Sequence, residues 1–277
     1  IDKYLLTWPQ VSKAQKRKSH FKIFLNRELQ FTALEIDSAR SELHCNFAEK
    51  SSPTFPGPLI YEEATLTNLN PTQAFRKRIH LAKRAQHEVL VANFINNTDT
   101  TTYHLFAGLM KAALRGTPVK LLMDGMGTFV GETVRDPEMV DLLLSTGVEV
   151  RVFNPLVNKI NHVGHRMHDK LYVTDDVMIV GSSSFYDSSF RGYLYELDTF
   201  VERSNAVEKA RRHFFSFWND TRVVTPYYTD GQQFKAVSQT KIQKFLDQYA
   251  PVPYWAERDL FPEVTGQAQK CQIALYL

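Results

Sequence analysis

The chain has 277 residues with 43% hydrophobic content, which is enough to build a buried core in one large domain or two small ones. A formal net charge of +3 is only mildly basic, so it permits an anionic partner without requiring one. The two cysteines, Cys45 and Cys271, lie far apart and lack metal-ligand spacing, so free thiols are expected. No run of 18 apolar residues occurs, so the sequence predicts no transmembrane helix in this chain.

Residues 1–58 are predicted to form an N-terminal extension and a linker. Lys and Arg cluster between Ser12 and Arg27, and such a cluster is either a solvated helix face or a surface that touches anionic lipid headgroups. Residues 51–58 are rich in Pro, Ser and Gly, a composition that predicts a joint before the main fold. Because the chain begins at Ile1 rather than Met, we expect that a signal peptide or an anchor has been removed, or that the sequence was cut from a longer one.

Residues 59–225 show alternating helix and strand patterns. Helices are expected at 70–86, 100–115, 137–145 and 205–218, and strands at 89–94, 119–123, 148–153 and 193–201. This β-α-β-α-β order predicts an α/β fold with a mixed, mainly parallel sheet flanked by helices on both faces. Residues 226–277 are predicted to contain a helix near 234–249 and a strand at 271–277.

One polar stretch interrupts this pattern. The residues on either side of the turn at Asp175 are β-compatible and predict two short strands. Because side chains at i and i+2 in a strand point the same way, about 6.5 Å apart, His168 and Lys170 are expected on one face and Asp169 on the other. An imidazole beside an ammonium suits a phosphate ester. The imidazole can attack phosphorus or carry a proton, and the ammonium neutralises the phosphoryl oxygens.

The second of these strands is followed directly by Gly181 and three serines. Such a loop offers backbone N–H groups and hydroxyls to an anion, so Ser182 and Ser184 are candidate substrate ligands. The alternative is a tight turn of small residues with no ligand. Asp175 has the opposite parity to His168, so a structural role at the turn is expected for it rather than direct chemistry.

The spacing His-x-Lys-x4-Asp with a following Gly-Ser resembles the HKD motif of the phospholipase D superfamily, and it is carried here by His168, Lys170, Asp175, Gly181 and Ser182. Segments 116–124, 153–168 and 195–198 further resemble the N-terminal half of bacterial cardiolipin synthases, so that the resemblance covers about residues 70 to 225. It implies a phospholipase D-like fold. It also implies hydrolysis or exchange of phosphodiesters through a phosphohistidine intermediate, with no metal and no other cofactor.

The sequence departs from the family pattern in two places. Five residues separate Asp175 from Gly181, where the family usually has six, and Ser184 stands where the family usually has Asn. A hydroxyl donates one hydrogen bond where an amide donates two. These departures favour a weaker phosphate cradle or a partly degenerate half-site.

Three carboxylates near the motif are candidates for supporting roles. A reactive imidazole is usually oriented by a carboxylate, and the resemblance implies Glu196, with Asp198 as the alternative. Asp124, at the end of a predicted strand, either reaches the site or caps the next element. The expected catalytic set is therefore the three motif residues His168, Lys170 and Asp175 together with Glu196.

The superfamily uses two such motifs, because one histidine attacks phosphorus while another protonates the leaving oxygen. This chain has one, so a second motif is expected from a homodimer partner, from another chain or from a missing half. Residues 270–277 resemble the opening strand of a second repeat.

The resemblance implies phosphatidyl transfer or cleavage of a phospholipid such as phosphatidylglycerol. It also implies a membrane-associated protein of the bacterial cell envelope, either peripheral or anchored by a removed N-terminal segment. One alternative is a dimeric nuclease acting on nucleic acid, which the modest net charge supports weakly. The other is a catalytically degenerate relative that binds phosphorylated ligands.

Overall fold

The computed structural model describes residues 61–130, 136–155, 165–194, 196–202, 205–228, 233–257 and 269–274, and three short N-terminal strands. These three strands form a small antiparallel sheet: β1 (Phe21–Ile23), β2 (Leu34–Asp37) and β3 (Glu42–His44). The rest of the predicted extension, including the linker at 51–58, lies outside the described residues.

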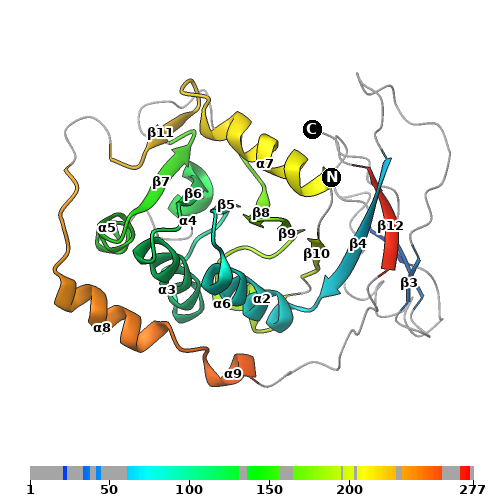
Figure 1. Ribbon diagram of the computed structural model, residues 1–277, viewed down its shortest axis with the longest axis horizontal. Helices are drawn as coiled ribbons and strands as arrows, with labels where there is room; N and C mark the ends of the chain where they lie inside the picture. Colours follow the sequence, from blue (N-terminus) through cyan, green and yellow to red (C-terminus); the bar gives the residue numbers. More distant parts are fainter. Residues whose placement is uncertain are drawn as a thin grey trace.

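A nine-stranded mixed sheet forms the main body (Figure 1). Its strands in spatial order are β11 (Val224–Pro226), β7 (Val148–Phe153), β6 (Val119–Asp124), β5 (Val89–Asn93), β8 (Lys170–Thr174), β9 (Val177–Gly181), β10 (Asp198–Glu202), β4 (Tyr61–Leu69) and β12 (Gln269–Ala274).

The mixed α/β class is confirmed, but the prediction of a mainly parallel sheet is wrong. Only the pairs β5–β6 and β6–β7 of the described sheet are parallel, and they are the strands joined by helical crossovers. The other pairs are antiparallel. After the crossovers, β8 and β9 are joined by a two-residue turn, which can connect only antiparallel neighbours.

Helices cover both faces of the sheet, as predicted. Their bounds are α2 (Pro71–Arg84), α3 (Thr100–Leu114), α4 (Gly125–Val130), α5 (Pro137–Ser145), α6 (Asp187–Phe190), α7 (Asn205–Trp218), α8 (Gln239–Tyr249) and α9 (Tyr254–Glu257). Most of them lie on one side with α2, which we call the α2 face, while α7 covers the opposite side, the α7 face (Figure 1).

The first helix of this body begins where the sequence predicts. The Asn70 side chain accepts a hydrogen bond from the Gln73 N–H at 2.8 Å, and the Gln73 side chain accepts one from the Asn70 N–H at 3.1 Å. This reciprocal capping box satisfies two backbone donors that the helix itself leaves unpaired. Pro71 at the first helical position has the backbone angle that a helix start requires.

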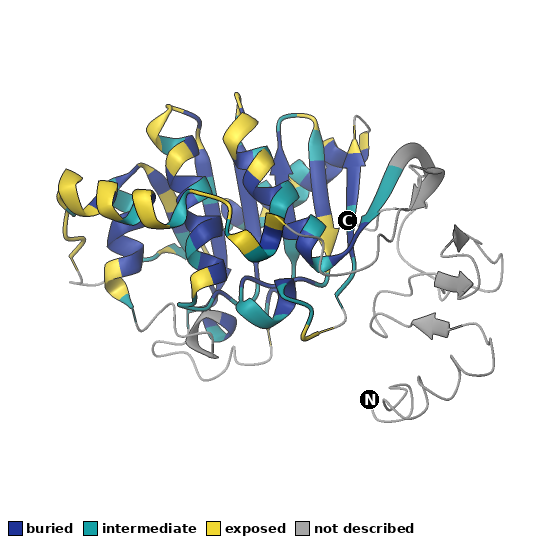
Figure 2. Ribbon diagram, turned by 90° about the horizontal axis from the view of Figure 1, so that it is seen from below, coloured by how far each residue is buried: buried dark blue, intermediate teal, exposed yellow. Residues whose placement is uncertain are grey.

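Two hydrophobic cores result from the alternation of side chains along the strands. Val91 and Leu121 belong to the core on the α2 face, while their neighbours Leu90 and Leu122 belong to the core on the α7 face. Figure 2 shows these buried strands between helices whose outer surfaces are exposed. Helix α8 contributes Ile242 and other side chains to the α2-face core, so the described part of residues 226–257 shares a core with the predicted HKD domain.

Two predicted strands differ in their bounds. The strand expected at 193–201 begins only at Asp198, because the described residues 193, 194, 196 and 197 are not extended in the sheet, and Tyr193 is 68% exposed. The terminal strand expected at 271–277 is found as β12, which pairs antiparallel with β4 at the edge of the sheet.

Candidate active site

Several strands begin or end along the same side of the sheet, at the tips of the strands rather than at an outer strand, and we call this side the site edge. Antiparallel pairing brings the first residue of β8, Lys170, opposite the last residue of β5, Asn93. In the same way Gly181 at the end of β9 lies opposite Asp198 at the start of β10. The motif lysine and the motif glycine therefore lie at the same edge, although the sequence separates them by ten residues.

His168 and Lys170 are in contact at this edge. The Lys170 Nζ atom lies 3.2 Å from His168 Nδ1 and 3.0 Å from the His168 carbonyl oxygen, and the His168 residue is exposed. Asp169 points to the opposite face, where its carboxylate is 2.8 Å from Nε2 of His213 on α7. The predicted division of these three side chains between two faces is confirmed, although His168 itself precedes the strand.

Phe94 packs against both members of this pair. Its ring centroid is 4.6 Å from that of His168 and 5.3 Å from Lys170 Nζ. An aromatic ring at this distance restricts the imidazole and attracts the ammonium through its electron-rich face. Phe94 is not among the site residues expected from the sequence, although it is an aromatic residue directly after a buried strand that ends at the site edge.

The two side chains shift each other's protonation. Partial burial lowers the pKa of His168, and the positive charge of Lys170 lowers it further, while Asp124 and Asp169 act in the opposite direction. Burial lowers the pKa of Lys170 to about 8, against the opposing effect of Glu196 and other carboxylates. At neutral pH the pair is therefore a neutral imidazole beside an ammonium that is still mostly protonated.

Asp124 holds the backbone that leads into the motif. Its buried carboxylate accepts hydrogen bonds from the N–H groups of Met126 at 2.8 Å and Gly127 at 3.0 Å, and from Met167 at 2.9 Å. Asp124 thus fixes the start of α4, the capping alternative considered from the sequence. It also fixes the residue that immediately precedes the motif histidine.

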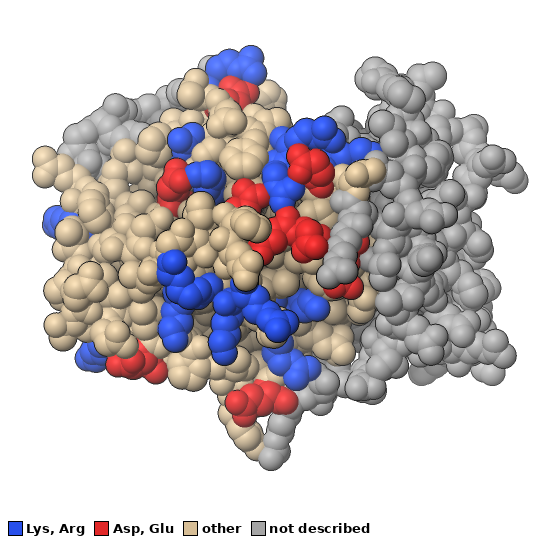
Figure 3. All heavy atoms as spheres, in the orientation of Figure 1, with Lys and Arg blue, Asp and Glu red and all other residues tan. Residues whose placement is uncertain are grey.

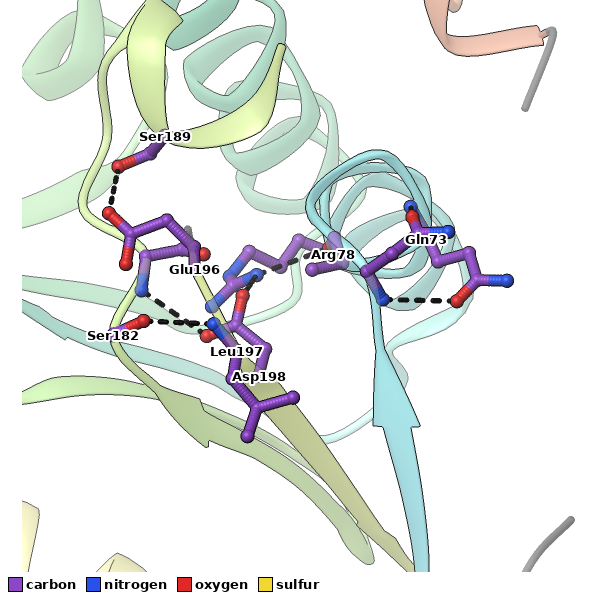
Figure 4. A network of polar contacts seen from close by, with 10 residues as sticks. Gln73, Arg78, Ser182, Ser189, Glu196, Leu197 and Asp198 are labelled. Carbon is purple, nitrogen blue, oxygen red and sulfur yellow. Dashed lines mark hydrogen bonds and ion pairs between the residues drawn. The ribbon is translucent and has the colours of Figure 1, made fainter. Parts of the chain in front are cut away.

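The motif glycine is required by a close approach of two strands. A Cβ atom on Gly181 would lie 2.2 Å from Asp198 Oδ1 and 2.3 Å from the Leu197 carbonyl oxygen. Asp198 is itself buried in an ion pair with Arg78, with Nη1 and Oδ2 2.9 Å apart (Figure 4). Since its carboxylate is committed to Arg78, Asp198 does not orient His168, and that alternative is wrong.

Glu196 lies on the Lys170 side of the site. Its carboxylate accepts a hydrogen bond from the Ser189 hydroxyl at 3.0 Å (Figure 4). Burial raises the pKa of Glu196, with Asp198 acting in the same direction, while Ser182, Ser189 and Lys170 oppose the shift. Within the described residues no hydrogen bond joins Glu196 to His168. The expected orientation of the imidazole by Glu196 is therefore not observed, and its charge acts on Lys170 instead.

The serine loop is tied to the neighbouring strand. The Ser182 N–H donates to the Leu197 carbonyl at 3.1 Å, and the Ser182 hydroxyl oxygen accepts from the Leu197 N–H at 3.0 Å (Figure 4). Ser183 and Ser184 are 1% and 2% exposed. This geometry supports the tight-turn interpretation, and the predicted role of Ser182 and Ser184 as phosphate ligands stays a prediction.

Asp175 lies at the far end of β8, about 17 Å from the site edge for a five-residue strand. Its carboxylate accepts hydrogen bonds from the backbone N–H groups of Gln86 at 3.1 Å, His87 at 2.9 Å and Glu88 at 3.3 Å. Burial alone would raise the pKa of Asp175, but these backbone bonds lower it below its usual value. The structural role expected at the turn is observed, so Asp175 does not belong among the residues that act on substrate.

Two other histidines, His162 and His165, lie just before the motif. His162 lies outside the described residues, and the backbone carbonyl of exposed His165 accepts a hydrogen bond from the Asn154 side chain at 2.9 Å. In the part of the chain that the structure describes, no group of three His, Cys, Asp or Glu side chains is placed to hold a metal ion. In that same part no helix has the length and apolar character needed to cross a bilayer.

Comparison with known proteins agrees with this fold. The profile described as "Cardiolipin synthase, PLD-like domain" matches residues 78–218, about half of the chain. The chain therefore belongs to the phospholipase D-like domain family of the cardiolipin synthases.

Individual relatives are distant and longer. Cardiolipin synthase C of Escherichia coli (strain K12) is 31% identical over 132 residues, which cover 42% of this chain and 26% of that protein. Cardiolipin synthase B of Salmonella typhi is 33% identical over 112 residues, covering 37% of this chain and 25% of the relative. The matched stretch thus spans about a quarter of the length of these two relatives.

Among solved structures, the phosphatidylserine synthase of Haemophilus influenzae Rd KW20 is similar in fold, with a TM-score of 0.54 and 14% identity. The match covers 69% of this chain and 45% of that one. At this identity the similarity supports the mixed α/β fold alone.

Proposed function

We propose that this chain provides one half of a phospholipase D-type active site that cleaves or transfers the phosphodiester of a phospholipid. The observation that carries the proposal is the exposed His168 residue, whose Nδ1 atom lies 3.2 Å from the Lys170 ammonium at the site edge. Membership of the cardiolipin synthase family supports phospholipid as the substrate class.

In the first step, Nε2 of His168 attacks phosphorus, and the P–O bond to the head group breaks as the N–P bond forms. The leaving oxygen takes a proton from a general acid, for which a second motif histidine is the candidate. The Lys170 ammonium neutralises the phosphoryl oxygens while negative charge develops on them.

Substrate binding would prepare the histidine for this attack. A protonated Lys170 donates to Nδ1, so the proton of the neutral His168 ring sits on Nε2, where it blocks the nucleophilic lone pair. When a phosphate oxygen takes over the Lys170 ammonium, Nδ1 no longer accepts its hydrogen bond. The ring can then release its Nε2 proton to water and take up a proton from water at Nδ1, which leaves the Nε2 lone pair free to attack. Displacement of this 3.2 Å contact by phosphate would therefore favour the tautomer in which Nε2 is the nucleophile.

In the second step, the hydroxyl of an acceptor alcohol, or water, attacks phosphorus and the N–P bond breaks. The base that accepts the hydroxyl proton is the same group that donated a proton in the first step, so the site returns to its starting state. Transfer to phosphatidylglycerol and simple hydrolysis differ only in this acceptor.

Intact mass spectrometry under conditions that preserve acid-labile phosphohistidine tests the proposal. The native chain, His168→Ala and His165→Ala are each incubated with short-chain phosphatidylglycerol, with and without a fragment that carries a second motif. We expect a phosphatidyl-sized adduct on the native chain and on His165→Ala, an exposed histidine three residues before His168, but none on His168→Ala.

Two other outcomes would contradict the phospholipid proposal. Cleavage of single-stranded DNA without a lipid adduct would assign the site to a nuclease. No adduct and no cleavage with the second motif supplied would leave a degenerate half-site.

A further inference from the structure

Four apolar side chains are exposed in two segments at the site edge of the α2 face. They are Tyr193 at 68%, Leu194 at 43%, Val252 at 37% and Tyr254 at 64%, and we call them the apolar rim. Leu194 lies two residues before Glu196, so the rim borders the candidate active site. The first pair follows α6 and the second pair lies at α9.

The two segments of the rim are neighbours. The Arg191 guanidinium, beside the first pair, is 5.7 Å from the ring centroid of Trp255, beside the second. Trp255 packs on Phe75 of α2 with centroids 4.8 Å apart, and Phe75 packs on Phe190 of α6 at 5.6 Å. Both segments therefore rest on the N-terminal half of α2.

The outer face of α2 is basic. The helix contains Lys and Arg residues and His80 but no Asp or Glu, and Lys83 and Arg84 in its last turn are exposed. Lys and Arg side chains gather over this helix in Figure 3. Burial lowers the pKa of His80, and the charges of Arg84, Lys77 and Lys83 lower it further, which is the effect expected of a local excess of positive charge.

We propose that the apolar rim and the basic outer face of α2 together dock this chain on an anionic phospholipid bilayer. Exposed tyrosines and a leucine suit the boundary between head groups and acyl chains, and Lys and Arg suit anionic head groups. With 14 residues α2 is about 21 Å long, so a flat surface can touch both features at once. A nucleic-acid surface would engage the basic residues but would leave the rim without a partner.

This inference rests on the proposed function only in the choice of lipid. Docking in this orientation places the loop that precedes Glu196 at the lipid surface. The site edge then lies beside the head groups of the layer from which the substrate would come.

Co-sedimentation with vesicles measures whether this surface binds lipid. The full chain is mixed with phosphatidylcholine vesicles that contain either no phosphatidylglycerol or about 30 mol% of it. At low salt, Lys83→Gln with Arg84→Gln is expected to weaken binding at least tenfold, since each basic residue contributes roughly fivefold. Tyr193→Ser with Leu194→Ser is expected to weaken binding at high salt as well, because insertion of apolar groups is not screened.

A matched control separates docking from general loss of apolar surface. Phe234, before α8, is 44% exposed and belongs neither to the apolar rim nor to α2. Phe234→Ser is expected to leave vesicle binding unchanged. Circular dichroism on every variant checks that the fold is retained.

The inference is overturned if the rim and charge variants bind vesicles as well as the native chain. It is also overturned if the rim variants dissociate a dimer of the native chain while their vesicle binding stays the same. Failure of the proposed function looks different. His168→Ala should bind vesicles as the native chain does. A native chain that binds vesicles but never forms an adduct would contradict the proposed function and leave the docking surface supported. If the rim variants turn over monomeric short-chain lipid and also bind vesicles as well as the native chain, the docking surface is contradicted and the proposed function is supported.

Discussion

At the scale of single residues, the site is a neutral imidazole beside an ammonium, and each lies where the other affects its protonation. Lys170 is partly buried beside an imidazole and an aromatic ring, and its ammonium is retained mainly through the nearby carboxylates Glu196 and Asp169. Its positive charge in turn favours the neutral form of His168. A neutral imidazole is the form that can attack or accept a proton, so the pair keeps His168 competent at lower pH than an isolated histidine.

Replacing Lys170 with Met is therefore expected to raise the pKa of His168, because the second largest cause of its lowered pKa disappears while burial remains. Titration of the His168 ring protons by NMR measures this directly. In an active assembly, the acid limb of the pH–rate profile should move to higher pH, and turnover should fall by at least about 100-fold through lost charge stabilisation.

A control for this experiment is Lys111→Met, an exposed lysine of α3, which should leave the titration of His168 unchanged. An unchanged His168 titration in Lys170→Met would mean that the two side chains are not in contact in solution.

At the scale of elements, close approach and anchoring decide where the motif strand lies. Gly181 lets β9 end against the backbone of β10, and Asp169 fastens the start of β8 to α7 through His213. Neither contact involves substrate in the proposed mechanism. Each nevertheless fixes the position of a motif residue beside it, so both elements should affect activity through geometry.

Gly181→Ala is expected to destabilise the fold by about 1–3 kcal/mol, because the new Cβ would meet backbone and carboxylate oxygens that cannot move independently. Gly108→Ala is the matched control. Its Cβ would meet Ala82 Cβ at 3.6 Å, an ordinary contact, so the better helix former should stabilise α3 by about 0.5–1 kcal/mol. Urea unfolding measures both, and a Gly181→Ala chain as stable as the native one would contradict the close approach.

The Asp169–His213 contact is expected to couple by about 0.5–1 kcal/mol in a double-mutant cycle with Asp169→Asn and His213→Phe. Both side chains are about one third exposed, so the contribution is modest. His213→Phe keeps an aromatic ring against Phe217, which lies 4.9 Å from the native imidazole, and so removes the polar contact alone. If the changes in the free energy of unfolding caused by the two single variants add up to that of the double variant, the contact does not anchor the strand.

At the scale of the whole molecule, one motif lies in a chain that spans about a quarter of the two cardiolipin synthases it matches. The proposed mechanism needs a general acid in addition to the nucleophile. The edge strand β12 pairs with β4 beside β10, so the sheet of this chain ends close to the strand that carries the loop of Glu196.

If a second copy supplies the second motif, specific activity should rise with chain concentration and should follow the dimer fraction measured by sedimentation velocity. If a separate half supplies it, adding that fragment should restore activity at any chain concentration. Full activity of a dilute monomer without any fragment would contradict the need for a second motif.

The sequence by itself determined the features that depend on local order. Spacing and periodicity predict the helix start near Asn70, the helices at 137–145 and 205–218, and the division of His168 and Asp169 between two faces. The structural role of Asp175 also follows from spacing. Side chains alternate between the two faces of a strand, so a residue seven positions after His168 points to the opposite face.

Only the tertiary structure decided the features that depend on distant partners. Antiparallel pairing after β7, the commitment of Asp198 to Arg78 and the contact of Phe94 with His168 join residues up to 120 positions apart. No local sequence pattern predicts which carboxylate pairs with a buried arginine, because the pairing depends on both burial and strand register. For the same reason the sequence could not show that the Glu196 carboxylate accepts a hydrogen bond from the Ser189 hydroxyl.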